Sequence, residues 1–300
     1  MPVITRSNSP SLLWPGIKAI FGNSYGEHPP EWSQIFDKET SDKAYEEKVE
    51  MLGFGLAPVK PEGSSIHYDE TGEGSKSRWT HVVYGLGFIV TREELEDNQY
   101  EVVASRRSRA LGRSMRVTAE IVHANVLNRA FSGSYVGGDG QPLLSNAHPT
   151  ANGTQSNLLT AADLSETSLE DAAKAVMSMK DSRGLPVAAR IKRLVIGTDE
   201  VFNATRILES QLRPGTPNND INAIKTMGTI PEVVANHYLT DSDAWFIQTD
   251  VPEGLASMWR REASLEKDND FDTENAKAKS TMRFSAGWGD WRAAFGSTGA

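Results

Sequence analysis

The longest regular pattern of apolar and polar positions lies in residues 97–131. This segment contains no proline and a single glycine, Gly112. Its apolar residues recur about every four positions, which predicts one helix with an apolar stripe along one side. The stripe consists of Leu111, Met115, Ala119, Val122, Val126 and Ala130. Since an α-helix rises about 1.5 Å per residue, this helix would span a whole small domain and lie on a packed sheet.

The opposite side of the predicted helix carries a row of arginines, spaced three and four residues apart. They are Arg106, Arg109, Arg113 and Arg116. Like charges at this spacing repel one another when they are unpaired. Three interpretations follow: a solvated face, contact with an acidic segment of the same or a neighbouring chain, and contact with nucleic acid. We hypothesise that the row bridges to acidic groups, with Asp268 and Asp270 as candidates.

Residues 56–90 alternate between polar and apolar positions in a way that predicts an extended β-hairpin. Two strand-like runs, 65–70 and 78–84, flank the polar segment 72–77, whose glycines predict the turn. An isolated two-stranded hairpin is marginally stable in water, so we expect this one to lie across another surface. Its candidate contact residues are Tyr68, Lys76 and Trp79.

The first 55 residues lack a strong core pattern and predict an arm with a few aromatic anchors. An apolar cluster at 12–21 is broken by Pro15, and residues 28–32 form a proline-kinked stretch. A terminal arm stays disordered unless it docks on a surface. Docking as the first helix of the same core and docking on another subunit are equally compatible with the sequence. The candidate contact residues are Trp14, Ile17 and Trp32.

After the long helix, the pattern predicts a second compact region that mixes helices and strands. The predicted elements are helices at 169–179 and 201–212, and strands at 193–198, 231–239 and 244–249. Residues 150–156 predict a polar linker ahead of this region. Residues 254–291 combine strand-like alternation with charged loops. The chain as a whole is therefore expected to belong to the α+β class.

Composition changes this picture mainly by exclusion. The 300 residues carry a formal net charge of −9 and no cysteine, which excludes disulfides and a cysteine nucleophile. No apolar stretch approaches the roughly 18 residues of a membrane span, and the N-terminus lacks a signal-peptide pattern. An acidic chain is also a poor sequence-blind binder of phosphate backbones. We therefore expect any nucleic acid to be surrounded by this protein without being gripped.

No constellation of side chains predicts a catalytic, cofactor or metal site. The histidines lie far apart, with no pair at the spacing of a helical zinc site. Residues 72–77 lack the order of a phosphate-binding loop, so a solvated turn is favoured. Residues 268–272 resemble the start of a calcium loop, but Thr273 and Lys279 stand where that loop needs glycine and glutamate. We favour a solvated acidic loop there, with a weak surface cation site as the alternative.

The order of these elements resembles the Hong Kong 97-type major capsid fold of tailed phages. The local motifs resemble those of the Mu-like major head subunit (gpT-like) family. These motifs are VTREE at 90–94, GDGQPLLSNAHP at 138–149, RLVIG at 193–197, ILES at 207–210, AWF at 244–246 and GWGDWR at 287–292. Each motif is weakly diagnostic alone, and their order and spacing make the resemblance specific.

The resemblance implies a division of the chain into four parts. They are an N-terminal arm at 1–55, an extended β-hairpin loop at 56–90, a peripheral domain at 91–160 and 240–300 with the spine helix at 97–131, and an axial α/β domain at 161–239. The extended loop would lie over an adjacent subunit, and the arm would reach across a neighbour.

The resemblance also implies a major capsid protein of the virion, assembled in the host cytoplasm. Pentamers and hexamers of the chain would close an icosahedral shell around double-stranded DNA without sequence-specific binding. A separate scaffold and a portal are implied partners, and decoration proteins are a further class; neither an enzymatic activity nor a membrane partner is expected. One alternative is an encapsulin-like nanocompartment of the same fold, whose cargo is an enzyme. A second, more remote one is a soluble hydrolase, which would stay small in sedimentation.

Overall fold

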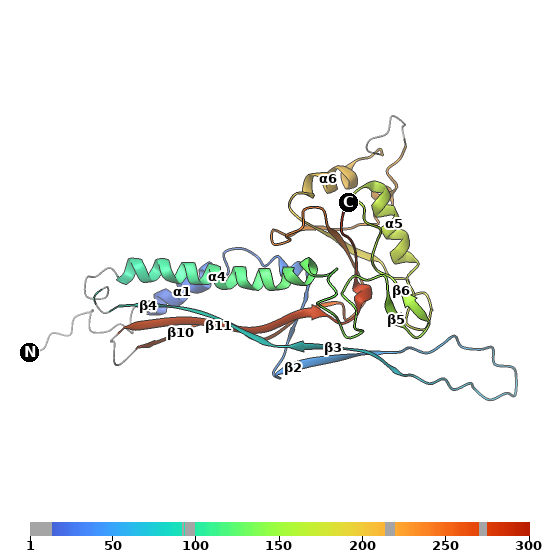
Figure 1. The fold of residues 1–300 in the computed structure, drawn as a ribbon, viewed down its shortest axis with the longest axis horizontal. Coiled ribbons are helices and arrows are strands. Elements are labelled where there is room, and N and C mark those ends of the chain that lie inside the picture. Colours follow the sequence, from blue (N-terminus) through green and yellow to red (C-terminus); the bar gives the residue numbers. More distant parts are fainter. Residues whose placement is uncertain (1–13, 92, 94–99, 214–219, 270–274) are drawn as a thin grey trace, which may run out of the picture.

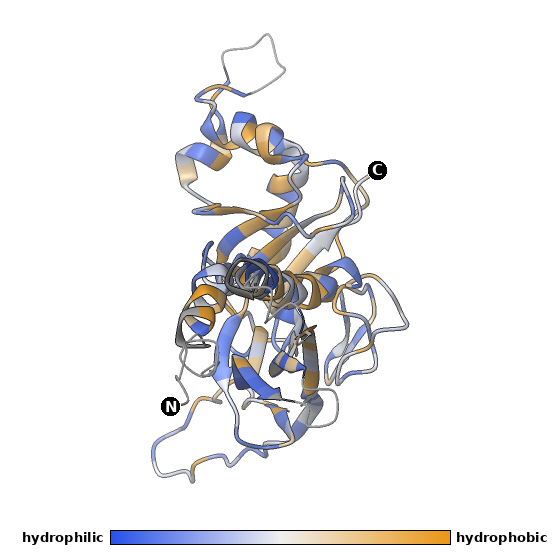
Figure 2. Cartoon of the chain, turned by 90° about the vertical axis from the view of Figure 1, so that its left-hand side faces the viewer, coloured by the Kyte–Doolittle hydropathy of each residue, from blue (hydrophilic) through white to orange (hydrophobic). Residues whose placement is uncertain are grey.

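The computed structural model describes residues 14–91, 93, 100–213, 220–269 and 275–300. The candidate residue Asp270 and the first residues of the predicted long helix lie outside this part. The described chain forms an elongated platform, and a second domain rises from one end of it (Figure 1). Seen along the platform, the sheet lies below the long helix and the second domain lies above it (Figure 2).

The sheet of the platform has four strands in the order β1-β10-β11-β4. Their bounds are β1 (Asp37–Thr40), β4 (Val82–Val90), β10 (Leu255–Asn269) and β11 (Ala276–Trp288). β1 runs parallel to β10, and the other neighbours are antiparallel. Because side chains alternate along a strand, Ala278, Met282 and Phe284 of β11 are all buried on one face. The alternation predicted near the C-terminus is thus confirmed as a long β-hairpin.

The long helix α4 (Tyr100–Asn128) lies along that face of the sheet (Figure 1). Its predicted apolar stripe is confirmed. Leu111, Met115 and Ala119 are buried in the main core, and Val122 and Val126 pack against this core. Residues 129–131 form a turn where the pattern predicted helix.

Two short helices of the N-terminal region, α1 (Trp14–Tyr25) and α2 (Trp32–Ile35), pack on this same subunit. α1 lies along α4 at Gly112, where a Cβ atom would come within 3.0 Å of the Phe21 carbonyl oxygen. Ile17 of α1 is buried with Val90 and with residues of α4 and β11. Of the two interpretations of the arm, the structure therefore favours docking as the first helix of the same core.

A ribbon of two further strands extends beneath the second domain and beyond the platform (Figure 1). β2 (Tyr45–Met51) pairs with β3 (Glu73–Thr80) in antiparallel fashion. Their connection, residues 52–72, contains neither helix nor strand. At His81 the chain leaves β3 and enters β4 of the platform sheet. We call β2, β3 and their connection the extended loop.

The strand pairing predicted within residues 56–90 is wrong. Segment 72–77 does not turn the chain, because most of it lies in β3, where Lys76 faces Val49 of β2. Segment 65–70 lies in the long connection and pairs with no strand among the described residues. Its alternating pattern predicted a strand, but a strand forms only where a neighbouring strand satisfies its backbone.

The second domain is built on a sheet of four strands in the order β12-β9-β7-β8. Its strands are β7 (Ile191–Ile196), β8 (Val233–Ala235), β9 (Trp245–Thr249) and β12 (Ala294–Ser297), and its helices are α5 (Glu166–Met177), α6 (Val201–Glu209) and α7 (Ala223–Met227). The predicted helices and strands of this region are confirmed, although β8 is shorter than predicted. Because β9 and β12 complete this sheet, it takes strands from the segment 240–300, which was predicted to be peripheral.

Two smaller elements complete the described chain. Strands β5 (His148–Thr150) and β6 (Gly153–Gln155) form a short hairpin. It occupies most of the stretch that was predicted to be a polar linker. A 3₁₀ turn, η3 (Trp291–Ala293), precedes β12. Its N-cap is Asp290, whose side chain accepts a hydrogen bond from the backbone of Arg292.

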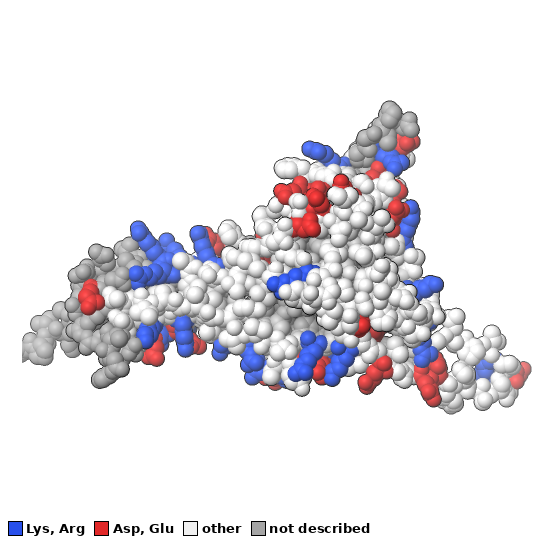
Figure 3. Space-filling model, viewed as in Figure 1, with Lys and Arg blue, Asp and Glu red and all other residues white. Residues whose placement is uncertain are grey.

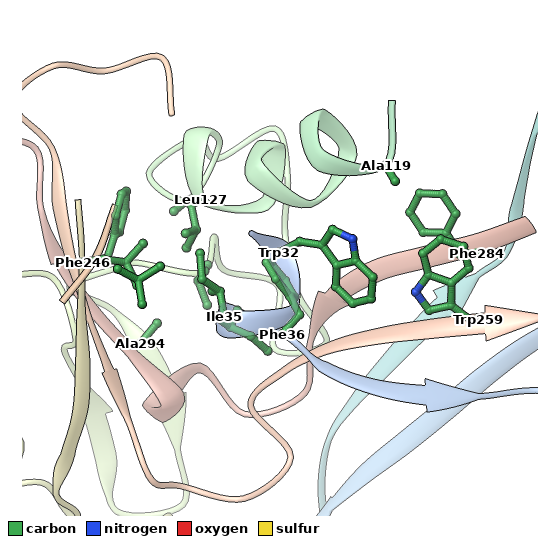
Figure 4. Close-up of a cluster of buried hydrophobic side chains, with 14 of the residues drawn as sticks. Trp32, Ile35, Phe36, Ala119, Leu127, Phe246, Trp259, Phe284 and Ala294 are labelled. Carbon is green, nitrogen blue, oxygen red and sulfur yellow. The ribbon is translucent and has the colours of Figure 1, made fainter. Parts of the chain in front are cut away.

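The main core joins the platform to the second domain. Trp32 and Phe36 from the N-terminal region meet Trp259 and Phe284 of the sheet, with α4 above them (Figure 4). At the other end of this cluster, Phe246 comes from the sheet of the second domain. A separate core lies under α5, α6 and α7. Since the main core contains residues of both parts, it holds them in one arrangement.

Candidate subunit-interface surfaces

Within the described residues, no candidate for a bound-ion site is found. No cluster of three or more His, Asp or Glu side chains in this part of the chain could hold a metal ion. None of the described helices is both long enough and apolar enough to cross a bilayer. The remaining candidates are surfaces at which one copy of the chain could meet another.

In the row of arginines on α4, two side chains face solvent and two contact the N-terminal region. Arg106 and Arg109 are exposed. Arg113 forms an ion pair with Glu27 at 3.2 Å. Arg116 is largely buried and pairs with Glu120 at 3.0 Å. Two of the four arginines thus bridge to acidic groups as hypothesised, but these groups belong to the same subunit.

Glu120 and Arg116 together fix the chain between α1 and α2. The Glu120 carboxylate accepts hydrogen bonds from the backbone N–H groups of Glu31 (3.1 Å) and Trp32 (3.0 Å). The Arg116 guanidinium donates to the carbonyl oxygens of Tyr25 (3.3 Å) and His28 (2.8 Å). Burial raises the pKa of Glu120, although the backbone N–H of Trp32 and the charge of Arg116 oppose this shift.

The structure places the predicted contact residues of the N-terminal arm mostly in the subunit's own core. Trp14 begins α1. Ile17 and Trp32 are 4% and 5% exposed, and the Trp32 ring stacks on His123 with a centroid distance of 4.4 Å. The expectation that these two side chains meet a neighbouring subunit is corrected, since their surface is already covered within one chain.

Two predicted contact residues of the hairpin lie at the root of the extended loop. Lys76 and Trp79 line a pocket of about 390 Å³ between β3, the segment 135–138 and β11. Lys76 pairs with Glu47 at 2.6 Å. Trp79 is 3% exposed, so it contributes packing at the root and little outer surface.

A buried charged cluster fastens the extended loop to the second domain. Arg292, which is 3% exposed, pairs with Glu50 of β2 at 3.1 Å and with Asp290 at 3.2 Å. Ser182 donates a hydrogen bond to Glu50 and accepts one from Arg292. Sequence reasoning missed this cluster, because Glu50 and Ser182 lie far along the chain from Asp290 and Arg292.

The same cluster holds its two carboxyl groups in different electrostatic environments. Burial raises the pKa of Asp290, even though Arg292 opposes the shift. For Glu50, burial also acts upward, but hydrogen bonds from Ser182 and Ser75 and the charge of Arg292 outweigh it, so its pKa is lowered. The Glu50–Arg292 pair is therefore the ionised link between the extended loop and the body of the subunit.

The connection of the extended loop is tied down at one further point. Asp69 accepts hydrogen bonds from the backbone of Gly55 at 2.7 Å and from Arg183 at 2.8 Å. These bonds lower the pKa of the Asp69 carboxyl group. Arg183 also donates to the carbonyl oxygen of Glu70. The two ends of the connection are thus joined to each other and to the loop that precedes β7.

Beyond this tie, the extended loop exposes apolar side chains with no core beneath them. Leu56, Val59 and Tyr68 are 82%, 92% and 87% exposed, and Phe54 and Ile66 are more than half exposed. Several large apolar side chains exposed on one projecting segment indicate a surface that binds another molecule. Tyr68 therefore remains a candidate contact residue. Asp268 also remains one, since it is exposed on β10.

Comparison with known proteins gives one family and a set of structures. Residues 75–296 match the family model that is described as phage capsid protein. No curated protein sequence matches the chain.

Several solved structures share the architecture of the whole chain. A procapsid of bacteriophage JBD30 aligns with a TM-score of 0.54 and 14% identity, covering 99% of this chain and 77% of that one. A virus-like particle from Pyrococcus furiosus aligns with a TM-score of 0.53 and 10% identity, covering 95% and 98%. A structure from Mycobacterium phage Adephagia aligns with a TM-score of 0.52 and 9% identity, covering 100% and 99%. Identities this low indicate a common fold and nothing narrower.

Proposed function

The chain belongs to the phage capsid protein family, and from this premise we propose that its copies assemble into the icosahedral shell of a phage head. The shared architecture is the predicted Hong Kong 97-type fold of the α+β class. The resemblance to the Mu-like head subunit (gpT-like) family stays a prediction within that larger group. So does the division into arm, extended loop, peripheral domain and axial domain.

The single observation that supports assembly most directly is the extended loop. It projects from the subunit and exposes apolar side chains from Phe54 to Tyr68 that no part of the described chain covers. Exposed apolar area of this kind is stabilised by burial at about 25 cal/mol per Å². In a shell, the neighbouring copy is the surface that covers it. Many modest contacts of this kind close a symmetric cage, because each bound copy raises the effective concentration for the next.

The proposal includes partners and a location for assembly. Copies of the chain form pentamers and hexamers, a scaffold and a portal direct closure, and assembly takes place in the host cytoplasm. The shell encloses double-stranded DNA without sequence-specific contacts, which the net charge of −9 supports. The chain acts as a structural subunit, and we propose no catalytic step for it.

An encapsulin-like nanocompartment is the second candidate. The virus-like particle from Pyrococcus furiosus shares the fold at 10% identity, but a shared fold does not indicate cargo. The family match favours the phage shell instead, because it is a match of sequence over residues 75–296.

Sedimentation velocity and electron microscopy of the purified full-length chain test the proposal. We expect large closed particles, with or without an added scaffold. A compact monomer at high protein concentration, even with a scaffold present, would contradict the shell function.

A further inference from the structure

The second domain exposes one aromatic side chain on the flank formed by α6. Phe202 is the second residue of α6 and is 74% exposed, whereas Ala204 and Ile207 of the same helix are buried in the core. Asp199 just before the helix is exposed, and Figure 3 shows acidic side chains gathered over α6. A phenyl ring left in water gives up the burial energy of a large apolar side chain.

The same domain carries an apolar pocket that none of its own large side chains fills. The pocket has a volume of about 620 Å³ and lies between α5, the start of β7 and the segment after α7. Val176 and Ile191 lie in its wall and are buried. Met177 and Met227 line it and are 56% and 68% exposed. Methionine side chains are flexible and make favourable contacts with aromatic rings, so they suit a site that receives one.

The surroundings of the exposed ring and of the pocket carry opposite charges. Arg190, which is exposed, also lines the pocket, so this side offers a cation where the Phe202 side offers Asp199. Figure 1 places α6 and α5 on opposite flanks of the second domain. Since Phe202 is largely exposed, it does not occupy the pocket of its own chain. The two features are thus suited to a contact between different copies.

We propose that Phe202 of one copy inserts into this pocket of a second copy, with Asp199 facing Arg190. A contact between two different surfaces of one chain is heterologous, and it closes into a ring when the rotation between copies allows it. This inference rests on the proposed function and adds to it the side chains that join neighbouring second domains within a capsomer.

A pair of engineered cysteines tests the contact, because the natural chain has none. The variant Phe202→Cys/Met177→Cys carries one thiol in place of the exposed ring and one in the wall of the pocket. Both residues are more than half exposed, so neither change disturbs the core. The matched control is Phe202→Cys/Ile221→Cys, since Ile221 is 69% exposed but does not line the pocket. Each single-cysteine variant is a further control.

Assembled particles of each variant are oxidised and analysed on a non-reducing gel. We expect the pocket pair to lose its monomer band and give a ladder that ends at the number of subunits in a ring. The control pair and the single variants should keep the monomer band. Particles that form normally while the pocket pair links no better than the control pair would overturn this inference alone. A natural chain that never forms particles would contradict the proposed function and the inference together.

Discussion

At the scale of single residues, the main core depends on a histidine that stays neutral. His123 of α4 is fully buried among Trp32, Phe36 and Phe284. Its Nδ1–H donates to the Ala119 carbonyl oxygen at 2.6 Å, and its Nε2 accepts from the Ser257 hydroxyl at 2.6 Å. Burial lowers the pKa of His123 to about 4, although the bond to Ala119 opposes the shift.

Because His123 is buried in its neutral form, we expect the unfolding free energy of the subunit to fall in acid. The pKa of His123 is about 4 when folded and 6.5 when unfolded, so the unfolded chain binds the proton first as pH falls. The stability is fully present above pH 6.5 and is lost progressively toward pH 4, by roughly 3 kcal/mol at 1.36 kcal/mol per pKa unit. Urea unfolding of the natural chain and of His123→Gln across this range measures the effect. Equal pH dependence in the two proteins would rule out this role for His123.

The cluster around Arg292 gives a second prediction at this scale. Arg292→Met removes the guanidinium that pairs with Glu50 and Asp290. These two partly buried carboxyl groups then have no cationic partner. Breaking a buried pair in this way costs roughly 3–5 kcal/mol. Thermal or urea unfolding measures the loss. Lys174→Met is the matched control, because its pair with Asp171 is exposed and its loss should leave the stability nearly unchanged. Similar effects of both changes would argue against the cluster as an anchor.

At the scale of elements, the packing of α1 on α4 depends on a glycine inside a long helix. Elsewhere in such a helix, glycine is unfavourable, by about 1 kcal/mol relative to alanine. Here the missing Cβ lets the backbone of α1 approach, since Phe21 and Tyr25 lie within 3.0–3.3 Å of its position. The pattern of the helix predicted its apolar stripe but gave no reason for this residue. Only the docked α1 explains it.

Gly112→Leu should therefore displace α1. We expect a loss of roughly 1–3 kcal/mol in unfolding free energy, typical of overpacking, together with faster proteolysis of the N-terminal region. Ala110→Leu is the control, because Ala110 is exposed on the same helix. Unchanged proteolysis in Gly112→Leu would show that α1 is not held at this point.

For the extended loop, we predict substitutions that weaken assembly without changing the stability of the folded subunit. Phe54→Ser/Tyr68→Ser alters exposed side chains, so we expect the unfolding free energy of the subunit to change by less than about 0.5 kcal/mol. Assembly should instead need a higher protein concentration, because the apolar surface that a neighbour covers is reduced. Light scattering against concentration measures this. Glu62→Gln, on the same loop, is the control. If the double variant assembles at the same protein concentration as the unmodified chain, the loop is excluded as an apolar contact.

At the scale of the whole molecule, the net charge of −9 bears on the contents of the shell. A wall that neutralises few phosphates binds DNA weakly and with a shallow dependence on salt. We expect purified empty particles to bind double-stranded DNA poorly even at low salt. Filter binding between about 50 and 200 mM salt measures this. Tight binding at low salt that falls steeply over this range would mean that the inner wall is basic despite the overall charge.

Local patterns in the sequence predicted several elements of the fold. α4, α5, α6 and the buried strand β7 follow from apolar periodicity, because such a period fixes which side of an element faces a core. The same patterns did not predict which strands pair with one another. Segment 65–70 has a strand pattern and forms no strand, while 72–77 contains glycines and continues β3. Pairing depends on which distant segment supplies the neighbouring backbone, and alternation does not carry that information.

The candidate surface was predicted only in part, for a related reason. Tyr68 is exposed as expected, whereas Ile17, Trp32 and Trp79 are buried within one subunit. An aromatic residue in a polar stretch shows that a contact exists, but the sequence does not state whether its partner belongs to the same chain. The Arg292 cluster was missed entirely, because Glu50 and Ser182 reach Arg292 only after three distant segments have packed together.

By itself, the sequence determined the class of this protein, its long two-faced helix and its family, because these depend on local periodicity and on the order of motifs along the chain. The tertiary structure decided where the N-terminal helices dock, which strands form the extended loop and which charges fasten it. These features arise from contacts between residues far apart in the chain. Local patterns cannot specify them, because each such contact is selected by the shape and charge of both partners at once.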